Sequence, residues 1–300
     1  MITFLNLGKK GNLGNQLFQI ASTIGIAKRN NQDFSFPTWQ FSDYFDFTFK
    51  TCDNLNFKRL EEKKYRYHTV EALNGDFNLN GWFQTEQYFE NSNIKSVFKF
   101  KQDFEESLLE KYSYLFSKKN ILITIRRGDF VNNPIFFQLN YKYYLTALLV
   151  HFEKLEEYNL IFASDNISYC KSHFSFLDNA FFLENLSPIE QLCLGSKFDN
   201  YIISNSTFSW WMAWLGENKN TKIIRPIHAF DGEYLKKNDD CDYFPKRWII
   251  HDYGKLKLSN TYFRLKIYAY FYSSIERGKY VYKVNKKHLK NRVKKIINYK

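Results

Sequence analysis

Apolar residues follow two patterns along this chain: short continuous runs, and segments in which they recur at every third or fourth position. The first pattern predicts buried strands, and the second predicts helices that turn one face to a core. Between residues 1 and 118 the patterns predict strands at 2–7 and 33–37, helices at 13–29 and 103–116, and a short strand or loop at 80–84. Residues 38–70 are rich in aromatic side chains without a clear period, so we assign no element to them.

From residue 121 onwards, strands and helices are predicted to alternate. The strands are expected at 121–125, 159–163, 180–183, 201–203 and 222–224, and the helices at 141–155, 166–174, 188–197 and 206–217. Such alternation is typical of an α/β unit with a parallel sheet. The polar stretch 117–120 separates this unit from the first, and 300 residues suffice for two domains. We therefore expect domains at 1–118 and 119–254, followed by a helical tail at 255–300.

The net charge of +12 is concentrated at the end of the chain. Residues 255–300 contain fourteen Lys and Arg and one acid, Glu276, whereas the rest has 29 basic and 30 acidic residues. Leu289, Val293 and Ile297 fall on one side of a helix in this tail, which can therefore lie on an anionic membrane surface. The alternative is a tail that packs back on the body with a basic outer face. Because the body is nearly neutral, we expect no nucleic-acid partner.

The cysteines indicate the expected cellular compartment. Cys52, Cys170, Cys193 and Cys241 are irregularly spaced, and none forms a C-x-x-C pair. Met1 leads directly into a strand-like run without a signal peptide, so we expect a cytoplasmic protein with reduced thiols. No apolar stretch approaches the roughly 20 residues needed to cross a bilayer, so membrane contact is expected to be peripheral, on the inner face.

Two junctions between a strand and a helix are candidate anion sites. The glycine loop 8–16 follows the first predicted strand, at the strand end where open α/β sheets bind ligands. Residues 204–207, with the sequence Ser-Asn-Ser-Thr, follow the apolar run 201–203 and open a helix. Free backbone N–H groups at a helix start, together with hydroxyls and an amide, suit a diphosphate. The alternative is that these residues only cap the helix, because all are good N-caps.

Charged residues follow two further predicted strands. Arg126 and Arg127 end the first of these, and guanidinium groups suit bidentate recognition of a phosphate. The alternative is an ion pair between either arginine and Asp129 that braces the loop. Asp165 ends the second strand, where a carboxylate can accept from a purine N–H or a ribose hydroxyl. Its alternative role is to cap the following helix.

Five motifs occur in a fixed order along the chain. They are Asn12-Leu13-Gly14-Asn15-Gln16-Leu17-Phe18-Gln19, Gly81-Trp82-Phe83-Gln84, Ile125-Arg126-Arg127-Gly128-Asp129, Phe162-Ala163-Ser164-Asp165 and Ile203-Ser204-Asn205-Ser206-Thr207-Phe208-Ser209-Trp210-Trp211. Each motif alone is weak to moderate evidence for a protein family. All five in this order resemble glycosyltransferase family 11, the bacterial and animal α-1,2-fucosyltransferases. The resemblance spans residues 1 to about 226, three quarters of the chain.

The resemblance implies a GT-B-like α/β fold in which two Rossmann-type domains face a cleft. It further implies transfer of L-fucose from GDP-β-L-fucose, with inversion, to a galactoside hydroxyl in an α-1,2 link. The acceptor would be a galactose-terminated glycan of a bacterial surface or an oligosaccharide. No metal or other cofactor would be needed. The residues agree, because the D-x-D sequence at 240–242 lies in a polar stretch and the six histidines lack ligand spacing.

The resemblance also assigns residues to roles. The expected donor-binding residues are Gly14, Asn15, Gln16, Arg126, Arg127, Asp165, Asn205, Ser206 and Thr207. Arg126 is expected to grip the diphosphate, with Arg127 supporting the loop or the nucleotide, and Asp165 to contact the guanine or ribose. The expected catalytic residues are Arg126 and Asp129. The base itself stays open, because a carboxylate that braces an arginine is a weaker base than a free one.

The chain departs from the family pattern at two positions. Thr124 stands where the family usually has histidine, and Asn166 replaces a common second aspartate. These departures leave open a transferase that uses another GDP-sugar or acceptor, or a relative of the protein O-fucosyltransferases. A basic nucleic-acid-binding protein is a more distant alternative.

Overall fold

The structure, a computed structural model, describes residues 1–52 and 56–255 together with a few scattered helical positions between 267 and 289. The predicted basic tail at 255–300 lies almost entirely outside the described residues, so its helical and membrane-binding character stays a prediction. In the described part of the chain, no helix is both long and apolar enough to cross a membrane. All four cysteines are free.

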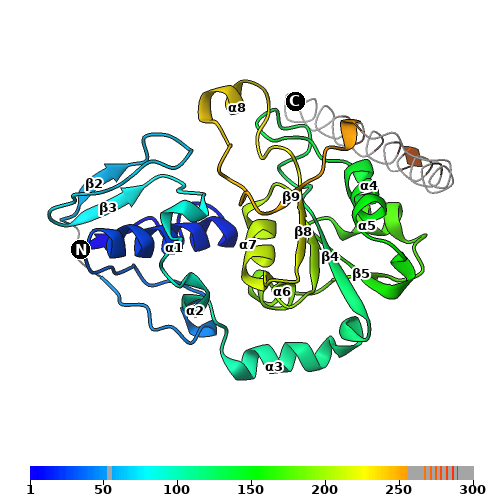
Figure 1. The fold of residues 1–300 in the computed structure, drawn as a ribbon, viewed down its shortest axis with the longest axis horizontal. Helices are drawn as coiled ribbons and strands as arrows, with labels where there is room; N and C mark the ends of the chain where they lie inside the picture. Colours follow the sequence, from blue (N-terminus) through cyan, green and yellow to red (C-terminus); the bar gives the residue numbers. More distant parts are fainter. Residues whose placement is uncertain are drawn as a thin grey trace, which may run out of the picture.

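The N-terminal part is built on a small parallel sheet with the strand order β1-β3-β2. Its strands are β1 (Ile2–Thr3), β2 (Lys58–Glu61) and β3 (Phe77–Asn80), and helix α1 (Leu13–Arg29) runs beside them (Figure 1). Nearly every residue of α1 from Leu13 to Ala27 is buried, so α1 is a core helix and not an amphipathic surface helix. The predicted helix at 13–29 is confirmed.

Two predicted strands of this part are shorter than expected. The strand at 2–7 stops after Thr3, because the chain turns at once and the Leu7 N–H donates to the Phe4 carbonyl. The strand at 33–37 is reduced to isolated bridges at Phe34 and Phe36. Short helical elements then lead out of this part: η1 (Ser42–Tyr44), η2 (Glu86–Tyr88), α2 (Ile94–Val97), α3 (Gln102–Lys111) and η3 (Ser113–Phe116). The helix predicted at 103–116 is therefore two helical segments.

The second part is a six-stranded parallel sheet with the order β6-β5-β4-β7-β8-β9. Its strands are β4 (Lys119–Ile125), β5 (Tyr158–Ser164), β6 (Ala180–Phe182), β7 (Asn200–Ile202), β8 (Lys222–Arg225) and β9 (Ile249–Ile250). Its helices are α4 (Tyr141–His151), η4 (Leu155–Glu157), α5 (Ile167–Phe174), α6 (Pro188–Gly195), α7 (Thr207–Gly216), α8 (Gly232–Asn238) and η5 (Tyr253–Lys255). The predicted α/β alternation is confirmed, whereas α8 and β9 were not predicted and α4 ends four residues early.

Side chains of the central strands alternate between two apolar layers. On β4, Ile121, Ile123 and Ile125 face the layer formed with α4 and α5, whereas Leu122 faces the opposite layer with α6 and α7. Because successive side chains of a strand point to opposite faces, a continuous apolar run is what a sheet covered by helices on both sides requires. The observed layers explain why this segment lacks a polar period.

The strand order reverses at the centre of the sheet. The chain runs from β4 outward through β5 and β6, then returns to β7 on the other side of β4 and continues to β8 and β9. In open α/β sheets, the carboxyl ends of the two strands at such a reversal border a crevice where ligands bind. The loops after β4 and β7 lie at this reversal, and they contain Arg126 and the 204–207 segment.

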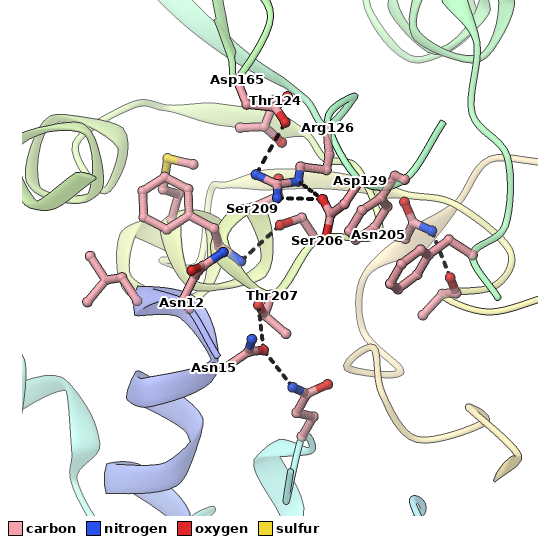
Figure 2. Close-up of a pocket in the computed structure, with 18 of the residues that line it drawn as sticks. Asn12, Asn15, Thr124, Arg126, Asp129, Asp165, Asn205, Ser206, Thr207 and Ser209 are labelled. Carbon is pink, nitrogen blue, oxygen red and sulfur yellow. Dashed lines mark hydrogen bonds and ion pairs between the residues drawn. The ribbon is translucent and has the colours of Figure 1, made fainter. Parts of the chain in front are cut away.

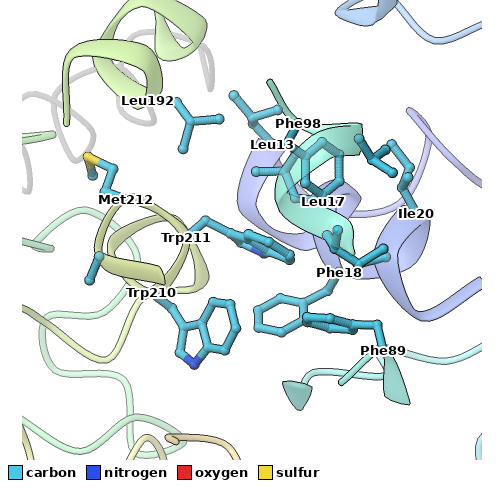
Figure 3. Close-up of a cluster of buried hydrophobic side chains, with 14 of the residues drawn as sticks. Leu13, Leu17, Phe18, Ile20, Phe89, Phe98, Leu192, Trp210, Trp211 and Met212 are labelled. Carbon is cyan, nitrogen blue, oxygen red and sulfur yellow. The ribbon is translucent and has the colours of Figure 1, made fainter. Parts of the chain in front are cut away.

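An aromatic cluster joins the two parts. Figure 3 shows Phe18 of α1 packed against Trp210 and Trp211 of α7. The centroid of the Phe18 ring lies 4.6 Å from that of Trp210 and 5.0 Å from that of Trp211. Phe89 stacks on Trp211 at 5.7 Å. One continuous buried cluster therefore covers the N-terminal part and the α6/α7 face of the large sheet. A large apolar contact of this kind restricts relative motion of the two parts.

His251 makes the stability of the fold sensitive to acid. Its ring is 3% exposed and contacts the Thr146 hydroxyl at 2.8 Å and the His151 ring at 3.1 Å. Burial, with a smaller contribution from His151, lowers the pKa of His251 from 6.5 to about 4. The unfolded chain therefore binds the proton between these values while the folded chain does not, and stability falls as pH falls through this window.

We expect His251 to account for about 2 kcal/mol of lost stability between pH 7 and pH 5. Urea unfolding of the wild type and of His251→Gln at the two pH values measures this, because glutamine keeps a hydrogen-bonding group without the titration. The variant is expected to show the smaller loss on acidification. Equal losses in the two proteins would assign the acid sensitivity to other groups.

Candidate functional site

A cavity of about 860 Å³ lies between the two parts of the molecule. Its volume is within the range of small-molecule binding pockets. The start of α1 and the segment around Trp82 line one side, and the loops after β4, β5 and β7 line the other. Figure 2 shows the polar side chains that point into it from both parts. The cavity therefore opens at the strand-order reversal.

Two helices begin at the cavity and almost touch there. A Cβ on Gly14, near the start of α1, would lie 2.5 Å from the backbone nitrogen of Phe208 in the first turn of α7. Asn12 is the N-cap of α1, but its side chain makes no capping bond. Ser206 caps α7 by accepting from the Phe208 N–H at 3.3 Å, so the capping alternative is confirmed for this serine. Both helix starts still present free N–H groups and positive partial charge to one space.

Arg126 reaches into the same cavity between two carboxylates. Its Nε and Nη2 donate to Asp129 Oδ1 at 3.2 and 2.6 Å, and its Nη1 lies 3.3 Å from Asp165 Oδ2 (Figure 2). Its guanidinium carbon also lies 5.5 Å from the centroid of the Phe130 ring. The bracing pair with Asp129 that the sequence offered as an alternative is thus present. It coexists with the position of Arg126 in the cavity wall.

Asp165 supports the arginine loop and does not cap the following helix. Its Oδ1 accepts from the backbone N–H of Arg127 at 2.8 Å, and its Oδ2 packs so closely on Gly128 that a Cβ there would lie 2.5 Å away. The N-cap of α5 is instead Asn166, whose side chain accepts from the Tyr169 N–H. Asp165 nevertheless lines the cavity, so contact with a ligand stays a prediction.

Of the two roles expected for Arg127, the structure supports the bracing of the loop and not a contact with the nucleotide. Its side chain is not among those that line the cavity, and its guanidinium lies 4.0 Å from the centroid of the Tyr169 ring on α5. Neighbouring residues at the end of a strand point to opposite sides, so only one of two adjacent arginines enters the cavity. Arg127 supports the loop through its backbone N–H and by stacking.

A hydrogen-bonded series of side chains crosses the floor of the cavity. The Tyr65 hydroxyl donates to Gln84 Oε1 at 2.5 Å, and Gln84 Nε2 donates to Asn15 Oδ1 at 2.7 Å. From the other part, the Thr207 hydroxyl donates to the same Asn15 oxygen at 3.0 Å, 192 residues along the chain (Figure 2). Two donors on Asn15 Oδ1 fix the amide orientation, and the contact of Asn15 with a donor stays a prediction.

Two of the expected donor-binding residues, Gln16 and Asn205, use their side-chain amides to hold other parts of the protein in place. Gln16 donates to the Gly11 carbonyl at 3.0 Å and accepts from the Trp39 indole at 2.8 Å, so it holds the glycine loop in shape. Asn205 donates to the Phe137 and Ala229 carbonyls at 3.1 and 2.7 Å. Both residues line the cavity, but their amide N–H groups are directed to the protein backbone.

Thr124, at the position where the family pattern has histidine, holds two strand ends together. Its hydroxyl accepts from the Ser204 N–H at 3.3 Å, and its side chain is 2% exposed. It therefore ties the end of β4 to the loop after β7 at the strand-order reversal.

The structure adds residues to the site that sequence patterns did not identify. Phe130 and Phe136 stack with centroids 3.7 Å apart and form an aromatic wall of the cavity with Phe230 and Tyr234. Outside the cavity lining, Glu62 holds the segment around Trp82, because it accepts from the backbone N–H groups of Trp82 and Phe83 at 2.6 and 2.8 Å. Burial raises the pKa of Glu62 to about 7. Neither feature has a local sequence signal, because Phe230 and Tyr234 are distant from Phe130 in the chain, and Trp82 and Phe83 are distant from Glu62.

The carboxylates of the D-x-D sequence are bound to backbone groups. Asp240 Oδ2 accepts from the Ala229 and Phe230 N–H groups, and its Oδ1 contacts His228 at 3.0 Å. Asp242 accepts from the Tyr67 N–H at 2.6 Å. These contacts show that both carboxylates hold loops in place. Within the described ranges, no group of three or more His, Cys, Asp or Glu is arranged to hold a metal ion.

Comparison with known proteins gives consistent matches. Residues 16–252 match the family described as Glycosyl transferase family 11. The α-1,2-colitosyltransferase of Escherichia coli is 25% identical, in an alignment that covers 80% of this chain and 96% of the relative. The O-antigen biosynthesis glycosyltransferase WbnK of the same species is 31% identical over 38% of this chain and 40% of the relative.

Solved structures share the fold. The fucosyltransferase NodZ from Bradyrhizobium superposes with a TM-score of 0.50 at 11% identity, covering 71% of this chain and 92% of NodZ. POFUT1 in complex with GDP gives a TM-score of 0.50 at 12% identity, covering 75% of this chain and 97% of that one. The two parallel α/β parts around a cavity are thus a GT-B-like fold, as the sequence predicted.

Proposed function

Because the chain belongs to glycosyl transferase family 11, and is therefore a glycosyltransferase, we propose that it transfers L-fucose from GDP-β-L-fucose to a galactoside hydroxyl. The proposed product is an α-1,2-linked fucoside formed with inversion, in the synthesis of a bacterial surface glycan or oligosaccharide. The named role of the relative WbnK in O-antigen biosynthesis supports this acceptor class. POFUT1, a solved structure with the same fold, is described in complex with GDP-fucose, and this supports a donor of that kind.

One observation carries the proposal: two helix starts and a guanidinium converge on one cavity. Arg126, the start of α7 at Thr207 and the start of α1 near Gly14 belong to three separate segments. Each is a good phosphate-binding group, and together they suit a diphosphate between the two parts. In this proposal, Asn15 and Thr207 face the donor while Ser206 shapes the helix start.

The proposed chemistry places the leaving group beside the Arg126 guanidinium and the two helix starts. The acceptor oxygen bonds to the anomeric carbon, and the bond from that carbon to the β-phosphate oxygen breaks, so negative charge develops on the departing GDP. Preorganised donors aimed at developing charge are usually the largest contribution to such catalysis. Arg126 and the helix-start N–H groups can supply them. We propose that neither a metal nor another cofactor takes part.

A second donor has specific support. The relative that matches along nearly its whole length is named an α-1,2-colitosyltransferase, and colitose is fucose without its 3-hydroxyl. A site that hydrogen-bonds the 3-hydroxyl would reject colitose strongly, whereas a site without that contact would discriminate little. The donor sugar is thus the part of the proposal that most needs a direct comparison. A protein O-fucosyltransferase activity has no comparable support.

The donor comparison also tests the proposed function. Purified full-length protein is incubated with GDP-fucose, GDP-colitose or GDP-mannose and a panel of galactosides, and GDP release and product linkage are measured. We expect turnover with GDP-fucose, an α-1,2 product, and no change on adding EDTA. Failure to bind GDP would contradict the function as a whole, and preference for GDP-colitose would select the second donor.

The location in the cell is also a proposal. We propose a cytoplasmic enzyme whose basic residues 255–300 attach it to the anionic inner face of the membrane, where lipid-linked acceptor glycans are found. The support is the concentration of positive charge in this segment.

A further inference from the structure

The cavity as it stands has the wrong charge for an anionic donor. Among the described residues that line it, the charged side chains are Arg126, Asp129 and Asp165, one cation against two anions. Arg126 is only 27% exposed and both carboxylates contact it. A diphosphate that enters must therefore compete with a carboxylate for the guanidinium.

The two carboxylates differ in how firmly they are held. Asp165 is 24% exposed and has a second partner, the Arg127 N–H, as well as close packing on Gly128. Asp129 is 63% exposed, and Arg126 is the partner of its carboxylate. Exposed ion pairs contribute little free energy, so Asp129 is the partner that an anion can displace.

Asp129 occupies the edge of the arginine that a phosphate would use. Its Oδ1 accepts from both Nε and Nη2, the two donors that lie side by side and can grip two oxygens of a phosphate. Asp165 contacts the remaining Nη1 and keeps the guanidinium in orientation. Displacing Asp129 would thus leave Arg126 anchored and turned toward the donor.

The displacement requires only a side-chain rotation. The Phe130 and Val131 N–H groups both donate to the Arg127 carbonyl, and Asn133 donates to the Asp129 carbonyl, so the backbone of this turn is fixed. Stacking of Phe130 on Phe136 fixes it further. Exposed side chains change rotamer in picoseconds to nanoseconds, so the exchange need not limit the rate.

We propose that Asp129 holds the place of the donor diphosphate on Arg126, and that donor binding releases it to act as the catalytic base. This inference rests on the proposed function and assigns a sequence of events to the same cavity. While its Oδ1 accepts from Arg126 Nε and Nη2, Asp129 is directed to the guanidinium and not to an acceptor hydroxyl. The exchange therefore frees the carboxylate for an acceptor hydroxyl only when the donor is present.

The proton and electrons balance in the proposed step. The acceptor hydroxyl oxygen bonds to the anomeric carbon and its proton passes to the Asp129 carboxylate. The electron pair of the bond between the anomeric carbon and the β-phosphate oxygen leaves with GDP.

The test uses the full chain with Asp129→Asn, and with Glu110→Gln on the exposed side of α3 as a control for the loss of one negative charge. Calorimetry with GDP measures binding, and GDP-fucose with a galactoside measures turnover. We expect Asp129→Asn to bind GDP about three- to tenfold more tightly than wild type, because its competitor for Arg126 is weakened. Its kcat is expected to fall about a hundredfold or more, because the base is lost. Glu110→Gln should change neither value.

Azide gives a readout that a structural role would not move. Azide attacks the anomeric carbon without releasing a proton, so it should restore turnover of GDP-fucose in Asp129→Asn. Unchanged or weaker GDP binding by this variant, unchanged kcat, or no rescue by azide would each overturn the inference while the proposed function stands. A wild type that does not bind GDP would overturn both. Thermal unfolding shows whether Asp129→Asn keeps the wild-type fold. A second variant, Asp129→Ala, repeats the binding and turnover measurements with the carboxylate removed.

Discussion

Arg126→Lys is expected to lower transfer from GDP-fucose about 10²–10³-fold while leaving the fold intact. Lysine keeps the positive charge but loses the planar fork that can hold two phosphate oxygens. It also cannot contact Asp129 and Asp165 from two edges at once, as Arg126 does. Initial rates of GDP release at saturating donor measure the loss, and circular dichroism and thermal unfolding check the fold.

Arg127→Lys is the matched control for this prediction. Arg127 is the neighbouring arginine, but its guanidinium lies over Tyr169 outside the cavity lining, and its contact to Asp165 is made by the backbone. We expect a far smaller loss of transfer from this variant. Wild-type rates in Arg126→Lys, or equal losses in the two variants, would remove the proposed role of Arg126 at the diphosphate.

Trp210→Ala is expected to lower the free energy of unfolding by about 3–5 kcal/mol. Trp210 is fully buried, its ring centroid lies 4.6 Å from that of Phe18, and its indole N–H donates to the Tyr243 carbonyl at 2.9 Å. Alanine would leave a large void between α1 and α7 and an unpaired carbonyl beside it. Urea unfolding curves of wild type and variant measure the difference.

The control for this prediction is Trp210→Phe, which keeps an aromatic ring in the cluster and is expected to be less destabilising. Because the starts of α1 and α7 form two sides of the cavity, transfer should fall in Trp210→Ala even where the protein remains folded. A loss below about 1 kcal/mol would mean that the two parts are not held together by this cluster. In that case the rigidity inferred from the shared core would be wrong.

Local patterns predicted the elements well where the side chains face a buried layer. The run 121–125 and helix 13–29 appear almost as expected, because burial on both sides produces a continuous apolar signal. The predictions failed where backbone turns decide the structure. Nothing in the side-chain pattern of 2–7 shows that the chain turns after Thr3, and β2, in the segment left unassigned, has one half-buried residue among exposed ones.

The site was predicted in part for a related reason. Polar residues that follow apolar strands lie at the carboxyl ends of those strands, where open α/β sheets bind ligands. Arg126, Asp165 and Thr207 could therefore be placed near a ligand from local sequence alone. The pairing of Asp165 with the Arg127 backbone, and of Asn15 with Thr207, depends on contacts between segments distant in the chain. The two hydrogen bonds that Glu62 accepts from the backbone N–H groups of Trp82 and Phe83 likewise join segments distant in the chain.

The sequence by itself determined the α/β alternation, the two helix starts with their anion-binding chemistry, and the family resemblance, because each depends on residues that are close together in the chain. Only the tertiary structure decided the strand order that places β4 beside β7, the choice of Arg126 over Arg127 for the cavity, and the meeting of α1 with α7. The physical reason is that side-chain periodicity reports which face of an element is buried. It does not report which distant element covers that face, and this selection sets the distances between charges in the cavity.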